Sequence, residues 1–222
     1  MRVLIVAATE FEISQIVADA RFSVYDCDRE AHIGKEAKAL YEGETISTLI
    51  TGVGMVATAF KLGKHLATEQ YDIVINLGIA GSFDRSIALG EVVEITEDTL
   101  SELGAEDDQG FLTIDAMGFG ESRFYPTYTL PDTFNLRKAS AITVNTVHGN
   151  NDSIKKLTGR IQPQIESMEG AAFFYACKQA GVPCMQIRAV SNYVEKRNRD
   201  NWQIGLAIKN LNNFAAEFLK SL

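Results

Sequence analysis

Two short segments near the C-terminal end carry side chains that can bind a sugar and a heterocycle. The first is Ser167-Met168-Glu169-Gly170, between an expected strand and an expected helix. The second is Arg188-Ala189-Val190-Ser191-Asn192, at the end of a strand expected over 182–191. Ligands of α/β proteins bind beyond the carboxyl ends of the strands. We therefore expect the carboxylate of Glu169 and the amide of Asn192 to meet one ligand, on its sugar and on its heterocycle edge.

A pair of carboxylates, Glu10 and Glu12, follows the first buried strand, Arg2 to Ala8. Acidic residues at the start of a helix are commonly stabilised by the helix dipole, which gives both a purely structural interpretation. The alternative is that one of them reaches into the crevice at the strand ends and acts as a general base. The residues alone leave both interpretations open.

Gly52-Val53-Gly54-Met55-Val56-Ala57 matches the dinucleotide-binding pattern G-x-G-x-x-A between a strand and a helix. Asp72 lies at a suitable distance, but it precedes the next strand, whereas the acid that binds a ribose should end it. We therefore favour a tight turn, or close approach of the backbone to a ligand, over NAD binding. Gly78-Ile79-Ala80-Gly81 is interpreted either as a strand-to-loop turn or as a lining in which Ala80 and Gly81 face a flat ligand.

The elements that must position these residues alternate between strands and helices, so the expected class is α/β. Strands are expected at 2–8, 45–51, 72–77, 91–96, 141–147, 164–167 and 182–191, with short β-like pieces around 23–25 and over 37–42. Helices are expected from about Glu10, after Gly54, over 170–178 and over 200–219. Residues 98–135 are expected to be irregular and to serve a binding site or a subunit contact. No linker or repeat divides the chain, so residues 1–222 are expected to form one domain.

Composition narrows the class of partner. The formal net charge of −8 disfavours nucleic acid and anionic membranes, which would repel an acidic surface. Cys27, Cys177 and Cys184 lack metal-site spacing and are expected to be free thiols in a reducing cytoplasm. No apolar run approaches the ~20 residues that span a bilayer. The expected partner is a small molecule, with no metal or organic cofactor.

Five motifs in order resemble the nucleoside phosphorylase and nucleosidase superfamily, and within it the branch of methylthioadenosine/S-adenosylhomocysteine nucleosidases and futalosine hydrolases. The motifs are 7–12 (AATEFE), 51–54 (TGVG), 76–81 (NLGIAG), 167–171 (SMEGA) and 188–192 (RAVSN). The resemblance covers nearly the whole chain. It implies a three-layer α/β/α fold around a mixed, partly closed sheet, in homodimers or larger assemblies.

The resemblance also implies a role for each matching residue. Glu12 would activate the attacking water, Glu169 would hold the ribose hydroxyls and Met168 would pack against the sugar. Asn192, together with Ser191, would meet the purine. The remaining residues that it places at the site are Ala8, Ala80, Gly81, His148 and Trp202, the last two as aromatic contacts.

Asn192 departs from the adenine-specific members, which carry an aspartate there. An asparagine carbonyl accepts from N7–H of the base while its NH₂ donates to a 6-oxo group, whereas the 6-amino group of adenine would oppose donor to donor. A substrate that leaves a buried polar group of the site unpaired is rejected by a factor on the order of 10⁴ relative to one that pairs with it. The sequence therefore predicts a hydrolase for a 6-oxopurine nucleoside.

The futalosine hydrolases of this branch fit that prediction: they would cleave futalosine to hypoxanthine and dehypoxanthine futalosine on the futalosine route to menaquinone. Arg197, Arg199 or Lys35 would then pair with the benzoate carboxylate, unless these are solvated surface charges. The alternatives are a methylthioadenosine/S-adenosylhomocysteine nucleosidase, a purine nucleoside phosphorylase and a catalytically silent nucleoside-binding domain. Asn192 argues against the methylthioadenosine/S-adenosylhomocysteine nucleosidase. The anionic Glu12 would repel phosphate, which argues against the phosphorylase. The presence of both Glu12 and Glu169 argues against a catalytically silent domain.

Overall fold

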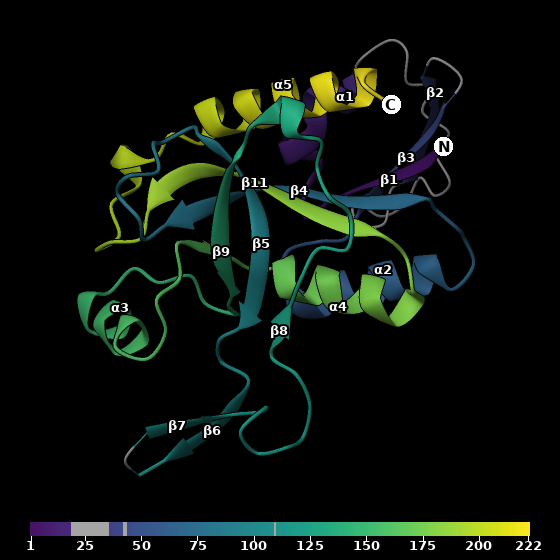
Figure 1. Cartoon of the computed structure of the whole chain (residues 1–222). Helices are drawn as coiled ribbons and strands as arrows, with labels where there is room; N and C mark the ends of the chain where they lie inside the picture. Colours follow the sequence, from purple (N-terminus) through teal and green to yellow (C-terminus); the bar gives the residue numbers. More distant parts are fainter. Residues whose placement is uncertain (19–35, 42–43, 109) are drawn as a thin grey trace.

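A mixed β-sheet of order β10-β9-β5-β11-β4-β1-β3-β2 forms the centre of the computed structural model, which describes residues 1–18, 36–41, 44–108 and 110–222 (Figure 1). Its strands are β1 (Arg2–Ala7), β2 (Glu36–Tyr41), β3 (Glu44–Ile50), β4 (Ile73–Ser82), β5 (Val92–Leu100), β8 (Arg123–Phe124, paired with β5), β9 (Arg137–Thr143), β10 (Ile165–Ser167) and β11 (Cys184–Tyr193). The α-helices are α1 (Ser14–Ala18), α2 (Met55–Leu66), α3 (Asn151–Thr158), α4 (Gly170–Ala180) and α5 (Ile204–Lys220). Short 3₁₀ turns lie at η1 (Glu10–Ile13), η2 (Asp132–Phe134) and η3 (Arg199–Asn201).

The sheet closes on itself through its shortest inner strand. β10 runs parallel to β9, with Ile165 opposite Ala141, and antiparallel to β4, with Glu166 opposite Gly81. The strands β4, β11, β5, β9 and β10 therefore form a ring, and β1, β3 and β2 extend it on one side. This arrangement confirms the expected mixed, partly closed sheet.

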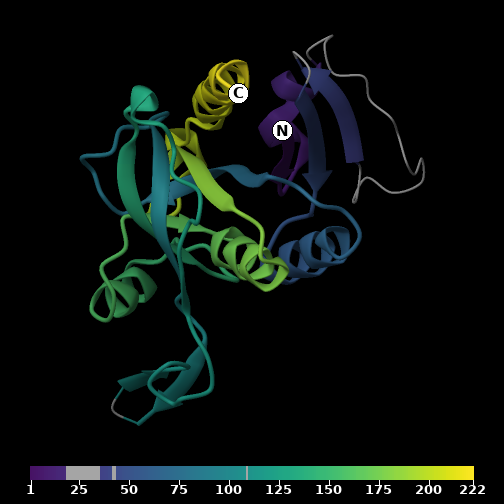
Figure 2. The same cartoon turned by 45° about the vertical axis from the view of Figure 1, so that its right-hand side comes forward.

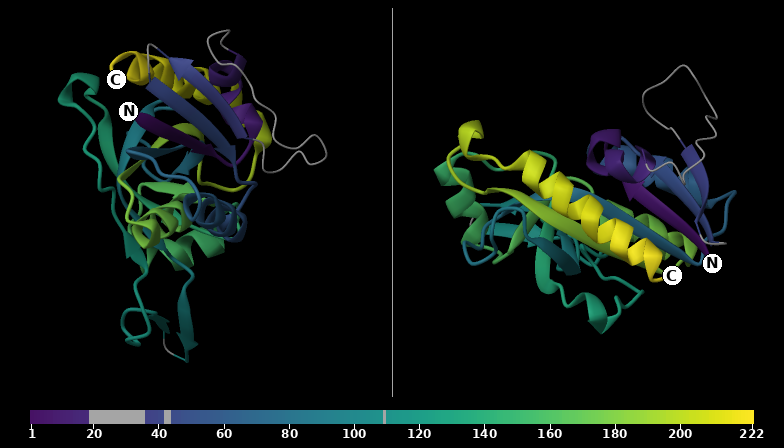
Figure 3. Two further views of the ribbon diagram at one scale, coloured as in Figure 1. Left: turned by 90° about the vertical axis from the view of Figure 1, so that its right-hand side faces the viewer. Right: turned by 90° about the horizontal axis from the view of Figure 1, so that it is seen from above.

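Helices cover both faces of the sheet. α1 and α5 lie on one face and α2 and α4 on the other, as Figure 1 and the two views of Figure 3 show. The side chains of β1 alternate accordingly: Val3 and Ile5 pack in the core cluster under α5, and Leu4 and Val6 pack in the cluster under α2 and α4. All four are fully buried or nearly so. The apolar run is thus a strand covered on both sides, and the three-layer α/β/α prediction is confirmed.

Several strands are longer than the sequence predicted. The strand expected over 72–77 continues to Ser82, so the segment Gly78 to Gly81 is paired strand and the turn interpretation is wrong. Pairing with β11 extends it, since Gly78 lies opposite Arg188 and Gly81 opposite Asn192. Likewise β5 runs on to residue 100 and β9 begins at 137.

The expected irregular stretch 98–135 contains strands. After β5 the hairpin β6 (Gly104–Asp107) and β7 (Gly110–Thr113) projects away from the body of the molecule (Figures 1 and 2). Beyond it the chain carries the exposed Phe119 and returns through β8. Helix α3 was not expected either; Asn150 caps it by accepting from the backbone N–H groups of Asp152 and Ser153.

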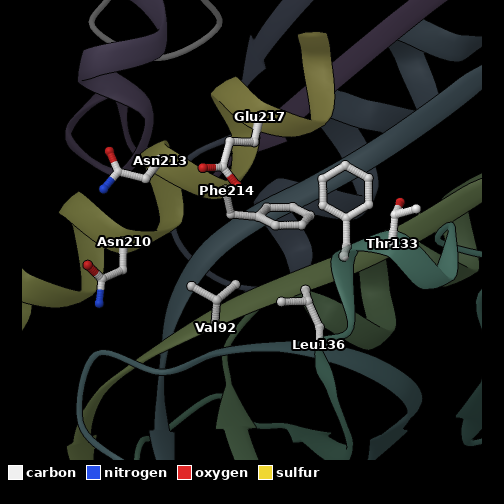
Figure 4. A pocket seen from close by; sticks show the side chains of 8 residues that line it. Val92, Thr133, Leu136, Asn210, Asn213, Phe214 and Glu217 are labelled. Atoms are coloured by element: carbon white, nitrogen blue, oxygen red, sulfur yellow. The ribbon is translucent and has the colours of Figure 1, made fainter. Parts of the chain in front are cut away.

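Within the described part of the chain, no helix has the length and apolar character needed to cross a membrane. Cys177 and Cys184 are free and buried, while Cys27 lies outside the described residues. A shallow cavity of about 440 Å³ lies between α5 and the segment around η2, where Phe214 faces Val92 and Leu136 (Figure 4). None of its lining residues belongs to the polar site described next.

Candidate active site

Glu12 is a buried carboxylate held at the carboxyl end of β1. Its Oε2 accepts hydrogen bonds from the backbone N–H and the hydroxyl of Thr9, at 2.9 and 3.0 Å. Its Oε1 accepts from the backbone N–H of Ile79 on β4, at 3.1 Å. Burial raises the pKa of Glu12 above its ordinary value of 4.5, with Arg188 opposing the rise and Glu169 adding to it. Glu12 therefore both caps the turn after β1 and contacts the backbone of β4, the strand next to β1.

Glu169 follows β10 and stands at the start of α4. Its Oε1 accepts from the backbone N–H of Gly54 at 3.0 Å, and its Oε2 lies 3.7 Å from Nη1 of Arg188. Gly54 has φ of +97°, a conformation open to glycine, and it immediately precedes α2. The glycine motif of residues 52–57 thus forms a turn that brings a backbone donor to Glu169.

Arg188 joins the two carboxylates and is 1% exposed. A Cβ atom added to Gly78 would lie 2.0 Å from Nη1 of Arg188 and 3.1 Å from Oε1 of Glu12, so both side chains converge over this glycine. Arg188 was part of a recognised motif, but the sequence reasoning gave it no role. The available signal was the polar pair Gln186 and Arg188, two residues apart in a strand that is otherwise apolar up to Val190, and hence on one face of it.

Asn192 lies near the end of β11, opposite Gly81 of β4. The hydroxyl of Ser191 faces the carbonyl of Ala80 at 3.1 Å and Oδ1 of Asn192 at 2.9 Å, and Nδ2 of Asn192 donates to the carbonyl of Tyr193 at 3.1 Å. A β-bulge between Val190 and Asn192 re-aims this end of β11. One N–H of the amide and a lone pair of its carbonyl remain for a ligand.

The structure brings most of the expected residues to one line along β4. Ala8 accepts from the backbone N–H of Gly52 at 3.1 Å, which ties the end of β1 to the glycine loop that reaches Glu169. Ala80 is buried and Gly81 half-buried, and Met168 directly precedes Glu169. The candidate site is therefore a strip from Glu12 to Asn192 across the carboxyl ends of β1, β4 and β11.

His148 and Trp202 stand apart from that strip. His148 pairs through Nδ1 with Glu166, whose Oε1 also accepts the backbone N–H of His148 at 2.9 Å. Burial raises the pKa of Glu166, and the hydrogen bonds from His148 oppose that rise. Glu166 lies opposite Gly81, so His148 approaches the Asn192 end from the side of β10. His148 also lines a cavity of about 1470 Å³ between the β6–β7 hairpin and α3.

Trp202 lies just after η3, in the segment that follows β11 and that we call the rim. It lines a separate cavity of about 360 Å³ with Arg85 and Tyr193, and the Cζ of Arg197 lies 4.8 Å from its ring centroid. The backbone N–H of Arg197 donates to the carbonyl of Gly149 at 2.9 Å, which links this rim to the loop of His148. The Cζ of Arg199 lies 5.9 Å from the same indole ring, and Lys35 falls outside the described residues.

Across the described ranges no group of three or more His, Cys, Asp or Glu side chains is arranged to hold a metal ion. The chemistry available at the strip is that of two buried carboxylates, one buried guanidinium and one oriented amide. Such a set can activate water, hold hydroxyl groups and stabilise a developing cation, and its amide can bind a planar heterocycle at its edge.

Comparison with known proteins places the chain among nucleosidases in sequence and in fold. Among curated relatives, a futalosine hydrolase of Acidothermus cellulolyticus is 32% identical over 183 residues, covering 78% of this chain and 75% of the relative. A 5′-methylthioadenosine/S-adenosylhomocysteine nucleosidase of Shewanella loihica is 28% identical over 207 residues, covering 86% of each chain. The solved structure of the futalosine hydrolase of Helicobacter pylori shares the fold, with a TM-score of 0.87 at 14% identity over 100% of this chain and 98% of that one.

These relatives confirm the expected enzyme class, N-glycosyl hydrolase. The model of one family matches residues 2–222, which is almost the full length of the sequence. Together with the closed mixed sheet, that match identifies the chain as a member of the Phosphorylase superfamily.

Proposed function

We propose that this protein hydrolyses the N-ribosidic bond of a 6-oxopurine nucleoside, and that the nucleoside is futalosine. The observation that carries the proposal is the amide of Asn192, held by Ser191 and Tyr193 at the end of a strip that begins with Glu12. Its free N–H and free lone pair match a 6-oxo group and an N7–H, whereas adenine would oppose the N–H with its own amino group. The base released would be hypoxanthine.

In the proposed reaction Glu12 orients a water molecule and removes its proton as that water attacks the anomeric carbon. The raised pKa of Glu12, caused by its burial, suits a base that works near neutral pH. Glu169 accepts hydrogen bonds from the ribose hydroxyls, and its charge complements the oxocarbenium-like transition state. Nη1 of Arg188 lies 3.7 Å from Oε2 of Glu169, and the charge of Arg188 opposes the rise in the pKa of Glu12 that burial causes.

At the other end of the strip Asn192 holds the departing base. An amide is a weak acid, so Asn192 stabilises the N7-protonated base and does not supply the proton itself. Met168 packs against the sugar, and Ala80 and Gly81 keep the floor of the site flat. Arg197, at the rim beside Trp202, is the candidate partner for a carboxylate on the 5′ substituent.

The comparisons support hydrolysis of an N-ribosidic bond, since the relatives include futalosine hydrolases and methylthioadenosine/S-adenosylhomocysteine nucleosidases. The two groups differ in the base that they release, so the choice between them rests on Asn192. A futalosine-cleaving enzyme would belong to the futalosine route to menaquinone.

The first experiment is a phosphate-free incubation of the protein with futalosine, inosine and methylthioadenosine in parallel, with release of free base followed by chromatography. Hypoxanthine from futalosine supports the proposal, and its absence from inosine would add a selective 5′ pocket. Adenine from methylthioadenosine alone would overturn the assignment of Asn192. A rate that depends on added phosphate would identify a phosphorylase instead.

A further inference from the structure

A chain of buried polar side chains connects Arg188 to Asp98. The Nε of Arg188 donates to Oε1 of Gln186 at 2.9 Å, and Nε2 of Gln186 donates to Oδ2 of Asp98 at 2.9 Å. Gln186 and Asp98 are both fully buried, on the adjacent strands β11 and β5. The second guanidinium arm of Arg188 donates to the side-chain carbonyl of Asn76 on β4.

Asp98 is also connected to the segment that carries Glu169, through a second set of hydrogen bonds. Oδ1 of Asp98 accepts from the hydroxyl of Thr143 on β9 at 2.8 Å, and that hydroxyl accepts from the backbone N–H of Ala171 at 2.8 Å. Ala171 lies in the first turn of α4, two residues after Glu169. Two successive hydrogen bonds therefore connect Asp98 to Arg188, and two others connect it to the start of α4, which follows Glu169.

The packing at this junction leaves no room for adjustment. A Cβ atom on Gly170 would lie 2.0 Å from Oδ2 of Asp98 and 2.1 Å from Oε1 of Gln186. The charged groups that act on Asp98 are Arg188 and Glu169; burial raises the pKa of Asp98 to about 6, against the hydrogen bonds from Gln186 and Thr143. Burying a carboxylate with only two neutral donors lowers the stability of the fold, and apolar side chains at this position would stabilise the fold at least as well.

We propose that Asp98 is a positioning residue of the active site, which orients Arg188 through Gln186 and the start of α4, hence Glu169, through Thr143. The reason is the donor and acceptor character of each group. A carboxylate only accepts, so Gln186 must turn its NH₂ to Asp98 and its carbonyl to the Nε of Arg188. The hydroxyl of Thr143 must likewise donate to Asp98, which leaves its lone pairs for Ala171.

The inference rests on the proposed function and is tested with Asp98→Asn, which keeps the shape of the side chain. The new NH₂ group faces either Gln186 or Thr143 as donor against donor, so one of the two routes must rearrange. We expect kcat for base release to fall ~10–100-fold, the effect of losing one hydrogen bond to a charged group, while KM changes less than ~3-fold.

A double-mutant cycle separates positioning from a general loss of stability. Gln186→Met removes the amide between Asp98 and Arg188, so adding Asp98→Asn to it should lower kcat by much less than Asp98→Asn does alone. Fully additive effects on kcat would show that Asp98 does not act through Gln186. Thermal unfolding of each variant is measured alongside, because stability alone would not produce coupling in kcat.

The Thr143 pair of variants tests the second route and covers the case in which Asp98→Asn does not fold. Thr143→Ser keeps the hydroxyl and should keep kcat within ~2-fold, whereas Thr143→Val removes the hydroxyl that Oδ1 of Asp98 and the backbone N–H of Ala171 share and should lower kcat ~10-fold or more. Equal kcat for the two variants would overturn the inference. The wild-type assay separates the proposals: no base released by the wild type refutes the proposed function, and an active wild type with an equally active Asp98→Asn refutes this inference alone.

Discussion

Nη1 of Arg188 lies 3.7 Å from Oε2 of Glu169, and both side chains are buried. Arg188 also converges with Glu12 over Gly78, so one guanidinium lies between two carboxylates inside the sheet. The three formal charges leave a net negative site, which suits a reaction whose transition state carries positive charge on the sugar. The predictions below follow from this arrangement.

Gly78→Ala should disable the site with a moderate effect on the fold. The added methyl group would lie 2.0 Å from Nη1 of Arg188, whose guanidinium is already bound to Gln186 and Asn76 and cannot move freely. We expect kcat to fall ~100-fold and the free energy of unfolding to fall by about 1–3 kcal/mol, as for other overpacked cores. Steady-state kinetics and urea unfolding measure the two effects.

The matched control is Gly63→Ala in the middle of α2, where an added Cβ meets no atom within 4 Å. Removing a glycine from a helix interior should stabilise the protein by roughly 0.5–1 kcal/mol and leave kcat unchanged. If Gly78→Ala turned over as fast as this control, the convergence of Arg188 and Glu12 over Gly78 would have no catalytic meaning.

Glu12→Gln should lower kcat for base release by ~10²–10⁴-fold, the usual effect of losing a general base, with substrate affinity largely kept. The amide retains an oxygen for the backbone N–H of Ile79 and cannot accept the proton of the water. Glu10→Gln, in the same turn but exposed, is the control and should keep its rate. Near wild-type turnover by Glu12→Gln would remove Glu12 from the mechanism.

The free energy of unfolding should depend on pH through the carboxylate of Glu12. Because burial raises the pKa of Glu12 in the folded state above 4.5, the folded protein favours the protonated form. Below pH 4.5 this group imposes no penalty, and the penalty of its buried charge appears as pH rises through the folded pKa. Urea unfolding at pH 5 and pH 8 should show Glu12→Gln gaining stability relative to wild type at the higher pH. An unchanged difference would mean that Glu12 titrates alike in both states.

The raised pKa of Glu12 should also be visible in the pH dependence of kcat. A general base acts when ionised, so kcat should fall on the acid side with an apparent pKa above the ordinary 4.5 of a glutamate. The pH profile of kcat between pH 4 and 8 measures it. An acid limb at or below 4.5 would contradict a raised pKa for the base.

Asn192→Asp should move base preference toward 6-aminopurines. The carboxylate has no donor for a 6-oxo group but accepts from a 6-amino group. We expect the ratio of kcat/KM for futalosine to that for methylthioadenosine to fall by ~10²–10⁴-fold. Asn213→Asp, exposed on α5 beside the cavity of Figure 4, adds the same charge elsewhere and should leave the ratio unchanged. A constant ratio in Asn192→Asp would show that this residue does not read the base.

Arg197→Gln tests the rim of the site. Arg197 is tied to Gly149 and stacks on Trp202, so it lies between the two aromatic positions expected near the substrate. If it binds the 5′ carboxylate, its loss should raise KM for futalosine at least ~10-fold and leave KM for inosine nearly unchanged. Arg199→Gln, whose guanidinium lies further from the indole, is the matched control. Equal effects on both substrates would mean that Arg197 is a solvated surface charge.

Local patterns were enough to predict most strands of the central sheet and the helices α2, α4 and α5, but neither α3 nor the strands β6, β7 and β8. A continuous apolar run such as Arg2 to Ala7 indicates a strand covered on both faces, and the three-four spacing of Ala207, Leu211 and Phe214 indicates a helix with one packed face. Ordered motifs at strand ends were also sufficient for the superfamily and for Glu12, Glu169 and Asn192 as candidates.

Strand length and ring closure depended on the tertiary structure. Glycines at 78 and 81 resemble a turn, yet β11 supplies hydrogen-bonding partners that extend β4 to Ser82. The strand expected just before Met168 is present as β10, but only its pairing with β9 on one side and β4 on the other closes the ring. Pairing between distant segments, which no local pattern records, decided both.

The sequence by itself determined which groups can do chemistry: two carboxylates, an amide and their places after strands. Only the tertiary structure decided that Arg188 lies between Glu12 and Glu169, and that Asp98 stands behind it. The physical reason is that a buried charge is tolerated only where partners from other strands satisfy it. Those partners come from β4, β5, β9 and α4, which are far apart in the chain and adjacent only once the sheet has closed.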